Sequence, residues 1–335
     1  MKTAVGQPLK KGAAYYRQIA YFILGVLVLV TLFVWATQKI DYMWRWYKMP
    51  QYFLQEKTIE VNARIPGTVE RIQEQDGDLQ VVVTGEEGTR TYTIPDGESM
   101  VYEGDMIFPG DTVGTYTKWG VGLLTEGLWL TLQISFYSSI LGIIIGLIGG
   151  IARISTNPAL RWSAITYVEI IRGSPLLVQI FIWYFVLATI INELLITYGL
   201  HEISAMWYGV AALACFAGAY VTEIVRSGIE SIHRGQIEAS RSLGMTSAQC
   251  MLHIVLPQAI RRILPPLAGQ FITLVKDSSL LGIIAIRELT KATREGIASS
   301  LQPYELWFLC AILYLVLTFT LSMFVQYLER RMGHP

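Results

Sequence analysis

Six long runs of apolar residues dominate this 335-residue sequence and limit the folds that it can adopt. Each run holds roughly 18 or more residues with few charges, enough to cross the ~30 Å hydrocarbon core of a bilayer as a helix. Hydrophobic residues make up 53% of the chain and charged residues only 16%, which is far from the soluble average. We therefore predict an α-helical polytopic membrane protein with six transmembrane helices, at about residues 19–37, 127–151, 175–195, 208–225, 267–286 and 306–327.

The first apolar run follows a basic stretch that holds Lys2, Lys10, Lys11 and Arg17. A secretory signal also begins this way, but its apolar core spans about 7 to 15 residues and a small-x-small cleavage site follows it. This run is longer and lacks such a site before the aromatic stretch after Lys39. We expect residues 1–38 to form a cytoplasmic tail and a retained membrane anchor, with a cleaved signal as the alternative.

The formal net charge is zero because two parts of the chain with opposite net charges cancel. Between Lys39 and Lys118 there are 14 acidic and 8 basic residues, a net charge of −6, so the remainder carries +6. The excess basic residues lie in alternate loops, and basic loops usually remain in the cytoplasm. This pattern predicts that both termini are cytoplasmic and that the acidic part lies outside, which agrees with an even number of spans.

Two segments of different character lie between the first and second apolar runs. Residues 39–57 contain the aromatic stretch IDYMWRWYKMPQYF, which predicts a segment at the outer membrane interface, because Tyr and Trp rings favour the headgroup level. An aromatic surface for another protein is the alternative. Residues 58–118 alternate apolar and polar positions between turn dipeptides such as Asp76-Gly77 and Gly104-Asp105, which predicts a small all-β exterior domain.

Part of this predicted β-domain, VYEGDMIFPGDTVG, looks like the turns of a biotinyl or lipoyl domain. Those domains carry their cofactor on a lysine at a turn tip, flanked by methionine, and no lysine here occupies that position. We therefore expect a rigid exterior module and not a carrier of a swinging cofactor arm.

Residues 119–335 hold the other five spans, joined by short loops except for a long polar loop at 227–266. We predict a helix from Arg226 to Ser240 and a left-handed stop at Gly244. A second helix should begin at Thr246 or Ser247, where a hydroxyl can cap it, and should end or kink at Pro257. The residues alone also fit a plain amphipathic loop that covers the ends of the spans.

The pattern in this loop resembles the EAA loop of ABC-importer permeases, with Ser in place of the usual third residue, Ala. The positions that carry the resemblance are Glu238, Ala239, Ser240, Gly244, Ile254, Leu256 and Pro257. Further segments, among them YVEIIRGSPLLVQIFIWYF, GAYVTEIVRSGI and KDSSLLGIIAI, are similar to the polar amino acid permeases of these importers. The resemblance covers about residues 120–331 and excludes the first span and the β-domain.

The resemblance implies a five-helix permease domain in the bacterial cytoplasmic membrane and an ATP-driven importer for polar amino acids. Its implied partners are a cytoplasmic ATPase dimer, which would use ATP and Mg, an extracytoplasmic solute-binding protein, and a second permease that is either a copy or a paralogue. The EAA loop would couple the permease to the ATPase. No cofactor bound by this chain and no nucleic-acid partner is expected, while membrane lipid surrounds the spans.

Charged residues also lie inside the fifth predicted span, where an unpaired charge costs at least ~2.5 kcal/mol. Lys276, Asp277, Ser278 and Ser279 offer both charge signs and two hydroxyls, as a zwitterionic amino acid would need. We take them, with Gln179 of the third span, as candidates for the substrate path. A structural ion pair between Lys276 and a carboxylate on another span is the alternative.

Other charged residues near the spans are predicted to have structural roles. Glu223 and Arg226 lie three residues apart on one helix and should form a pair. Glu169 and Arg172, which precede the third span, should be cytoplasmic and structural.

The sequence lacks the parts of an enzyme. Its four histidines have no metal-ligand spacing, and no phosphate-binding glycine loop is present. No catalytic residue and no metal site are expected, and the three cysteines should pack as small apolar residues. A membrane scaffold or sensor, whose β-domain binds an exterior ligand or partner, is the main alternative function, and the EAA loop argues against a secondary transporter.

Overall fold

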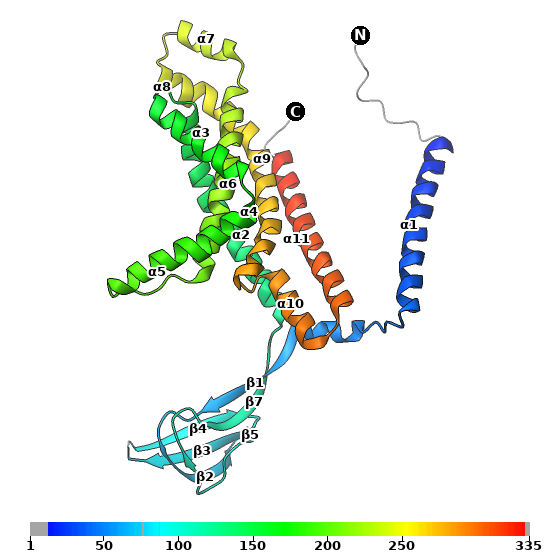
Figure 1. The fold of residues 1–335 in the computed structure, drawn as a ribbon, viewed down its shortest axis with the longest axis vertical. Helices are drawn as coiled ribbons and strands as arrows, with labels where there is room; N and C mark the ends of the chain where they lie inside the picture. The colour runs from blue at the N-terminus through cyan, green and yellow to red at the C-terminus, as the bar shows by residue number, and fades with distance from the viewer. Residues whose placement is uncertain (1–12, 76, 87, 332–335) are drawn as a thin grey trace. The chain divides into compact units, whose positions relative to one another are not determined.

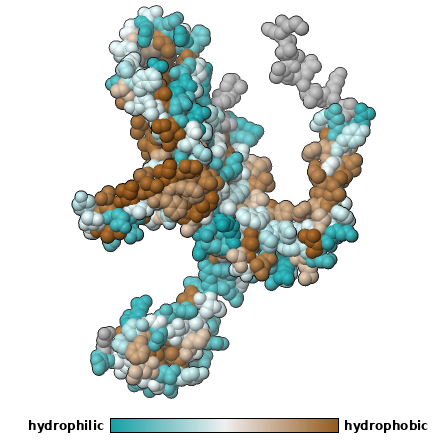
Figure 2. Space-filling model, viewed as in Figure 1, coloured by the Kyte–Doolittle hydropathy of each residue, from teal (hydrophilic) through white to brown (hydrophobic). Residues whose placement is uncertain are grey.

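The computed structural model describes residues 13–75, 77–86 and 88–331. It divides into two compact units, Met1–Trp46 and Tyr47–Pro335, which we describe separately. Among its described residues the first unit contains the helix α1 (Ala13–Lys39), drawn in blue in Figure 1. None of the apolar stretch of α1 is buried against protein, and Figure 2 shows it covered by hydrophobic side chains. A helix in this state needs lipid or a partner around it.

The second unit begins within a short 3-10 helix, η1 (Trp46–Tyr52), which is followed by seven β-strands in the part of the chain that the structure describes (Figure 1). The strands form a three-stranded sheet in the order β1-β7-β5 and a four-stranded sheet in the order β4-β3-β2-β6, with every pair antiparallel. Their bounds are β1 Leu54–Asn62, β2 Gly67–Gln75, β3 Asp78–Gly85, β4 Gly88–Pro95, β5 Glu98–Ser99, β6 Met106–Ile107 and β7 Thr112–Val121. We call residues 54–121 the β-module.

The β-module has its own hydrophobic core, as the alternating sequence pattern predicts. Val81 and Val83 are two residues apart on β3, so they face the same side of the sheet, and both are fully buried. Ile94 of β4 and Val113 of β7 complete the centre of the same cluster. Strands from both sheets contribute to this core, so the two sheets pack against each other.

The β-module is joined to the helices through β1 and β7, whose ends lie side by side. Gly122 donates its backbone N–H to the Phe53 carbonyl over 2.7 Å, and a Cβ at Gly122 would lie only 2.4 Å from the Tyr52 carbonyl oxygen. Lys57 Nζ of β1 lies 2.6 Å from Glu126 Oε1 of the first helix that follows. Glycine is required at this junction because the two backbone segments approach closely.

Part of the aromatic segment 39–57, which the sequence predicts to lie at the outer membrane interface, packs on helices of the same chain. Met49 and Tyr52 are buried in a cluster with Leu124, Leu289 and Leu306, which belong to three different helices. Trp46 and Tyr47 remain exposed. The alternation of aromatic and polar residues could not show which rings pack against the helices, because the partners lie more than 60 residues away in the chain.

The helices of the second unit follow the strands without a break. Their bounds are α2 Leu123–Arg153, α3 Pro158–Gly173, α4 Leu176–Phe181, η2 Ile182–Leu187, α5 Ala188–Thr197, α6 Ala205–Glu230, α7 Arg234–Ser242, α8 Ser247–Cys250, η3 Met251–Val255, α9 Leu256–Asp277, η4 Ser278–Ile284, α10 Leu289–Ser300 and α11 Pro303–Arg331. Here η2 and η3 are single π-helical segments, and η4 is a 3-10 helix.

Six helical segments in the described part of the chain are long and apolar enough to cross a membrane, which confirms the predicted number. They are Tyr15–Lys39, Leu123–Arg153, Leu176–Thr197, Ala205–Glu230, Ser247–Ile284 and Pro303–Tyr327. The predicted third span corresponds to α4, η2 and α5 in one continuous helix. Figure 2 shows hydrophobic side chains along α5, in keeping with a lipid-facing segment.

The helices α2 and α6 pack closely through a row of glycines. Gly142, Gly146 and Gly150 follow one another at intervals of four residues on α2, so they share one face of the helix. A Cβ at Gly146 would lie 2.3 Å from Val221 Cβ of α6, and one at Gly150 would lie 2.5 Å from Val225 Cγ1. Small residues allow helix backbones to approach in a membrane, where burial of apolar surface does not favour association.

Two helices outside the six spans were not predicted. The helix α3 begins at Pro158 after an Asn157 cap, whose side chain accepts the Ala159 N–H over 2.9 Å. The helix α10 begins after Glu288 and packs on α2, where a Cβ at Gly127 would lie 2.7 Å from Ala292 Cβ. Both helices carry polar residues between apolar ones, so a search for long apolar runs passes over them.

Candidate functional site

The loop between α6 and α9 contains the residues that resemble the EAA motif. The structure divides the predicted helix from Arg226 to Ser240 into two, because α6 ends at Glu230 and α7 begins at Arg234. His233 caps α7 by accepting the Gly235 N–H at Nδ1 over 3.1 Å, while the neighbouring Ile232 is buried. The prediction of one continuous helix was therefore wrong, because a capping side chain and a buried anchor separate the two parts.

The stop at Gly244 is confirmed. Gly244 has a φ of +80° and donates its N–H to the Arg241 carbonyl over 2.9 Å. The next residue, Met245, donates its N–H to the Ser240 carbonyl over 3.2 Å. These two bonds form a Schellman motif, which satisfies the last carbonyls of α7 and requires the left-handed conformation that glycine adopts without strain.

The cap of the following helix is also confirmed. Thr246 Oγ1 accepts the Gln249 N–H over 3.3 Å, and Gln249 Oε1 accepts the Thr246 N–H over 2.9 Å. This reciprocal pair is a capping box, which satisfies two N–H groups at the start of the helix.

Ser240, the residue at which the chain departs from the usual EAA sequence, joins α7 to α8. Its side chain is buried, with 3% exposed. Its Oγ lies 2.8 Å from both the Ile237 carbonyl oxygen and the Cys250 Sγ. The hydroxyl thus holds the two short helices together, a role that alanine could not fill.

The other residues of the first half of the motif lie on the surface. Glu238 and Ala239 are exposed on α7, and Leu243 at its end is 83% exposed. Leu243, Gly244 and His253 line a shallow hollow of about 340 Å³. We call α7 together with residues 243–246 the loop tip. An exposed leucine at a rigid helix end is suited to a contact with another protein.

Ile254, Leu256 and Pro257 lie in a helix that does not end at proline. The helix runs without interruption from Ser247 to Ile284, so the predicted helix end at Pro257 was wrong. Leu256 donates its N–H to the Met251 carbonyl, five residues earlier, in the π-helical segment η3. The wider turn just before Pro257 lets the helix accommodate a residue without an N–H.

Pro265 and Pro266 also lie inside α9. Proline is tolerated in membrane helices because neighbouring helices and polar side chains can satisfy the freed backbone groups. The residues that resemble the second half of the motif therefore belong to the same rigid element as the fifth span.

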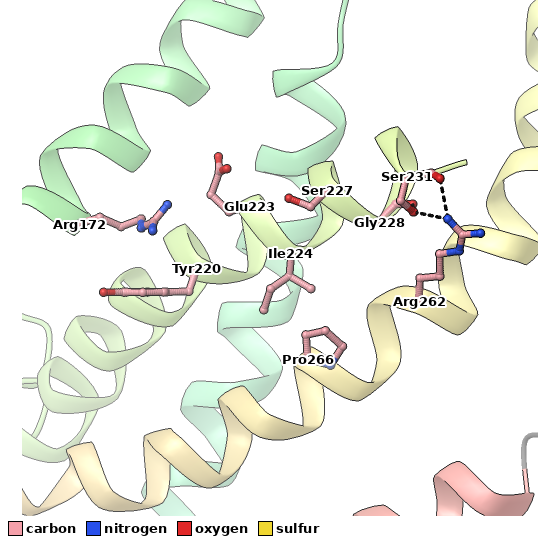
Figure 3. Close-up of a pocket in the computed structure, with 9 residues that line it drawn as sticks. All are labelled: Arg172, Tyr220, Glu223, Ile224, Ser227, Gly228, Ser231, Arg262 and Pro266. Atoms are coloured by element: carbon pink, nitrogen blue, oxygen red, sulfur yellow. Dashed lines mark hydrogen bonds between the residues drawn. The ribbon is translucent and has the colours of Figure 1, made fainter. Parts of the chain in front are cut away.

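A groove of about 440 Å³ lies beside this loop, between α3, α6 and α9 (Figure 3). Arg172 of α3 lies with its Cζ 5.1 Å from the centre of the Tyr220 ring of α6. Across the groove, Arg262 of α9 donates from Nη1 to Ser231 Oγ over 2.9 Å and also to the Ser231 carbonyl. The groove therefore has a guanidinium group at either end.

Glu223 lies on the same groove and is held by two arginines. The predicted pair with Arg226 is confirmed, since Glu223 Oε2 lies 2.9 Å from Arg226 Nη2. Arg153 of α2 adds a second ion pair, with Nε 2.9 Å from Glu223 Oε1, although its N–H is not aligned for a hydrogen bond. The Arg153–Glu223 pair could not be predicted from the sequence, because its two residues are 70 positions apart and lie on different helices.

The four residues proposed for the substrate path lie near the C-terminal end of the continuous helix Ser247–Ile284. Lys276 is eight residues from the end of the span at Ile284, and its side chain is exposed. Asp277 and Ser279 are half-buried, and Ser278 is buried, with Oγ donating to the Val275 carbonyl over 2.8 Å.

Gln179 contacts the backbone at the junction of α3 and α4. Its Nε2 donates to the Ile171 carbonyl over 2.7 Å and to Ser174 Oγ over 2.9 Å. Its Oε1 is buried and has no hydrogen-bond partner among the residues that the structure describes. The amide nitrogen of Gln179 thus holds the two helices together and makes no hydrogen bond to Lys276.

Glu288 is a buried acid that the sequence analysis did not single out. Its side chain is 0% exposed, and it caps α10 by accepting the N–H groups of Thr290 and Lys291, each over 2.8 Å. Tyr314 of α11 donates its hydroxyl to Glu288 Oε2 over 3.0 Å. Burial raises the pKa of Glu288, against the opposing effect of these hydrogen bonds. The sequence offered one signal for this capping role, an acidic residue three positions before Lys291, whose N–H it accepts.

A known family matches most of the helical part of this chain. The family described as "Binding-protein-dependent transport system inner membrane component" matches residues 139–334. The chain belongs to this family. The matched residues contain the loop tip, the groove residues Arg172 and Glu223, and the fifth and sixth spans, whereas α1 and all of the β-module lie before them.

Individual relatives agree with the family. The glutamine transport system permease protein GlnP of Escherichia coli (strain K12) is 37% identical over 212 residues, which cover 63% of this chain and 94% of that protein. The probable glutamine ABC transporter permease protein GlnM of Bacillus subtilis (strain 168) is 38% identical over 207 residues, 62% of this chain and 92% of that protein.

Solved structures show the same arrangement of helices. A crystal structure of an amino acid ABC transporter with histidines matches with a TM-score of 0.56 and 36% identity, covering 62% of this chain and 94% of that chain. An inward-facing MetNI methionine ABC transporter matches with a TM-score of 0.52 and 22% identity, covering 63% and 97%. The second likeness concerns the fold alone.

Proposed function

We propose that this chain is the permease subunit of an ATP-driven importer for polar amino acids in the bacterial cytoplasmic membrane. The observation that carries the proposal is the loop tip, a rigid exposed element that ends in a Schellman motif at Gly244. It lies in a chain of a binding-protein-dependent transport family. The similarity to permeases named for glutamine supports a polar amino acid as the substrate.

The loop tip is the proposed contact with a cytoplasmic ATPase. Glu238, Ala239 and Leu243 are exposed there, and Ser240 fixes the angle between α7 and α8 through Cys250. Because η3 and α9 continue α8 as one helix, a movement of the loop tip would be carried along the fifth span. ATP and Mg would be bound by the ATPase and not by this chain, which contributes no catalytic residue.

The substrate path is proposed to run past Lys276, Asp277, Ser278 and Ser279. These residues lie where α9 ends and η4 begins, and they provide a positive charge, a negative charge and two hydroxyls. A zwitterionic substrate requires groups of both charge signs. The buried Oε1 of Gln179 is an acceptor that a substrate ammonium group could use.

The proposed assembly contains two permeases, two ATPase subunits and an extracytoplasmic solute-binding protein. The second permease is a copy of this chain or a paralogue. Both termini and the loop tip would be cytoplasmic, and the β-module would be exterior. The acidic charge of residues 39–118 and the basic charge of the loops support this orientation.

Purification from native membranes followed by reconstitution tests the proposal. We expect an ATPase to co-elute with the chain, and we expect proteoliposomes of the complex to take up glutamine or another polar amino acid when ATP and a binding protein are supplied. Net uptake separates an importer from a membrane scaffold or sensor, because a sensor can bind ligand without moving it. ATP hydrolysis without uptake of any amino acid would contradict the proposal.

A further inference from the structure

The β-module contains a repeated sequence of six residues that the proposed transport function does not explain. Residues 100–105 read MVYEGD and residues 106–111 read MIFPGD. Each copy has the order Met, aliphatic, aromatic, any residue, Gly, Asp. The copies follow one another directly, at the turns that connect β5, β6 and β7.

The structure builds the two copies in the same way. Asp105 Oδ2 accepts the Tyr102 N–H over 2.8 Å, and Asp111 Oδ2 accepts the Phe108 N–H over 2.8 Å. The backbone N–H of each aspartate returns to the carbonyl of the same aromatic residue, over 3.1 Å in the first turn and 3.0 Å in the second. Each aromatic residue therefore begins a turn that its aspartate closes.

The glycines tie the first turn to β2 and the second turn to the residue that follows β1. Gly104 and Gly110 have φ values of +94° and +103°, the left-handed region that favours glycine. Gly104 donates its N–H to the Val69 carbonyl over 2.8 Å, and Gly110 donates to the Ala63 carbonyl over 2.8 Å. Val69 and Ala63 return the bond by donating to the carbonyls of the two aspartates, over 2.9 Å and 2.8 Å.

This framework determines which side chains point inward and which point outward. The aliphatic residues Val101 and Ile107 are buried in the core of the β-module. The residues on either side of them are exposed to an unusual degree for apolar side chains. The exposed fractions are 57% for Met100, 80% for Tyr102, 71% for Met106 and 58% for Phe108.

We call Met100, Tyr102, Met106 and Phe108 the twin-turn surface. Its folding role is small, because the turns are held by aspartate, glycine and backbone groups, and the core is filled by the aliphatic residues between. Exposed methionine and aromatic side chains on a rigid frame are typical of protein contact surfaces, since both offer a large apolar area. The aromatic rings also lose little conformational entropy on binding. A polar residue at these positions would serve the fold equally well.

Charge indicates the kind of partner. Residues 54–121 contain 13 acidic and 5 basic residues, a net charge of −8. Asp105 and Asp111 lie within the repeats, and Glu103 lies beside Tyr102. The partner that fits is therefore a protein with an apolar patch bordered by lysine or arginine. Anionic lipid headgroups would be repelled.

The position of the turns in the β-module also favours a protein over the membrane. The second turn is followed by β7, which runs for ten residues, Thr112–Val121, before the chain enters α2. At ~3.3 Å per residue this strand separates the turn from the start of α2 by about 30 Å. The twin-turn surface thus lies at the end of the β-module that is opposite to its junction with the helices.

We propose that the twin-turn surface is the docking site for the importer's exterior solute-binding protein. This inference rests on the proposed function, which requires such a partner, and it assigns the contact to four side chains outside the matched family region. The β-module then serves to hold the binding protein near the permease, which raises its local concentration.

The test uses the complex of this chain and its ATPase in lipid nanodiscs, with the solute-binding protein that stimulates its ATP hydrolysis. We expect the double variant Tyr102→Ser/Phe108→Ser to raise the half-maximal concentration of binding protein at least about tenfold, with basal and maximal ATP hydrolysis unchanged. Increasing KCl should raise the same concentration for the unchanged protein, because the contact is charge-assisted. A matched control is Trp119→Ser, an equally exposed aromatic at the other end of β7, which should have no effect.

Three results would overturn the assignment. The first is stimulation of the unchanged complex with no shift in the double variant. The second is an equal shift in Trp119→Ser, which would indicate a general loss of apolar surface. The third is a change in oligomeric state, which would make a second copy of the chain the occupant. If no binding protein stimulates the unchanged complex, the proposed function fails together with the docking site, and that result is distinct from the other three.

Discussion

Gly244 determines where α7 ends. Because the space around it is open, a substitution there would cause backbone strain but no steric clash. A Cβ at this position would have nothing within 4 Å, so a substitution acts only through the φ of +80°. Gly199, which follows α5, has a φ of +70° and is equally open. The two glycines therefore form a matched pair, one in the proposed coupling loop and one outside it.

We expect Gly244→Ala to weaken ATPase association about fivefold, because the left-handed conformation costs a residue with a side chain about 1 kcal/mol. Gly199→Ala should lower the stability of the protein by a similar amount without weakening ATPase association. Co-purification at several ATPase concentrations and thermal unfolding measure the two effects. Equal association by both variants and the unchanged protein would argue against the coupling role of the loop tip.

Glu288 gives a prediction about pH. Its pKa is raised by burial, so the folded protein binds a proton at this group more strongly than the unfolded chain does. The free energy of unfolding that this group contributes is present below its ordinary pKa of about 4.3 and is lost as the pH rises through the raised value. Glu288→Gln cannot ionise. Between pH 4.5 and 7.5 the unchanged protein should lose thermal stability relative to Glu288→Gln, and parallel profiles would contradict the prediction.

At the scale of elements, the glycine row of α2 controls the closest helix contact. Gly146→Val would place side-chain atoms on Val221, since even a Cβ would lie 2.3 Å from Val221 Cβ. Overpacking of this kind costs about 1–3 kcal/mol, so we expect a lower midpoint of thermal unfolding in detergent. Gly269→Val on α9 is the control, because a Cβ there would meet nothing within 4 Å. Equal losses in both variants would point to helix propensity and not to packing.

Sequence patterns over a few residues predicted where helices end better than they predicted whether a helix continues. The left-handed Gly244, the Thr246 cap and the Glu223–Arg226 pair depend on residues within five positions of one another, and all three are present. The passage of a helix through Pro257 was not predictable in this way. A π-helical segment there satisfies the backbone, and proline propensity carries no information about such a compensation.

Contacts between distant elements were also beyond the sequence. Arg153 approaches Glu223 across 70 residues, and Ser240 reaches Cys250 between two short helices. The groove at Arg172 and Arg262 appears only when α3, α6 and α9 are placed together. The resemblance to a permease family supplied the architecture, whereas the pairings within it depend on packing angles that a single sequence does not contain.

At the scale of the whole molecule, the first question is orientation in the membrane. We expect Glu74→Cys on β2 to react with an impermeant thiol reagent in intact cells, and Ser247→Cys on α8 to react only after the membrane is opened. Both positions are exposed, so access to the reagent depends on the side of the membrane. The measurement requires a background without Cys215, Cys250 and Cys310. Labelling of Ser247→Cys in sealed cells would reverse the proposed orientation.

Removal of the β-module tests whether it is accessory to transport, and the structure shows where to cut. Gln55 and Gly120 are paired across β1 and β7, so their Cα atoms lie about 5 Å apart. A short Gly-Ser linker can therefore replace residues 56–119 without moving either end. The cut keeps Met49 and Tyr52, which are buried against the helices. It removes the Lys57–Glu126 ion pair, a half-exposed pair worth at most about 1 kcal/mol.

We expect this deletion to insert in the membrane and to retain basal ATP hydrolysis, because the loop tip and all six apolar helices remain. Stimulation by the solute-binding protein should require a much higher concentration, since the twin-turn surface is absent. The matched control is Tyr52→Ala in the full-length chain, which should leave that concentration unchanged but lower stability by about 3 to 5 kcal/mol, the usual cost of truncating a buried aromatic residue. If the correctly inserted deletion hydrolyses no ATP, the β-module is part of the transport cycle itself, because no contact of the loop tip has been changed.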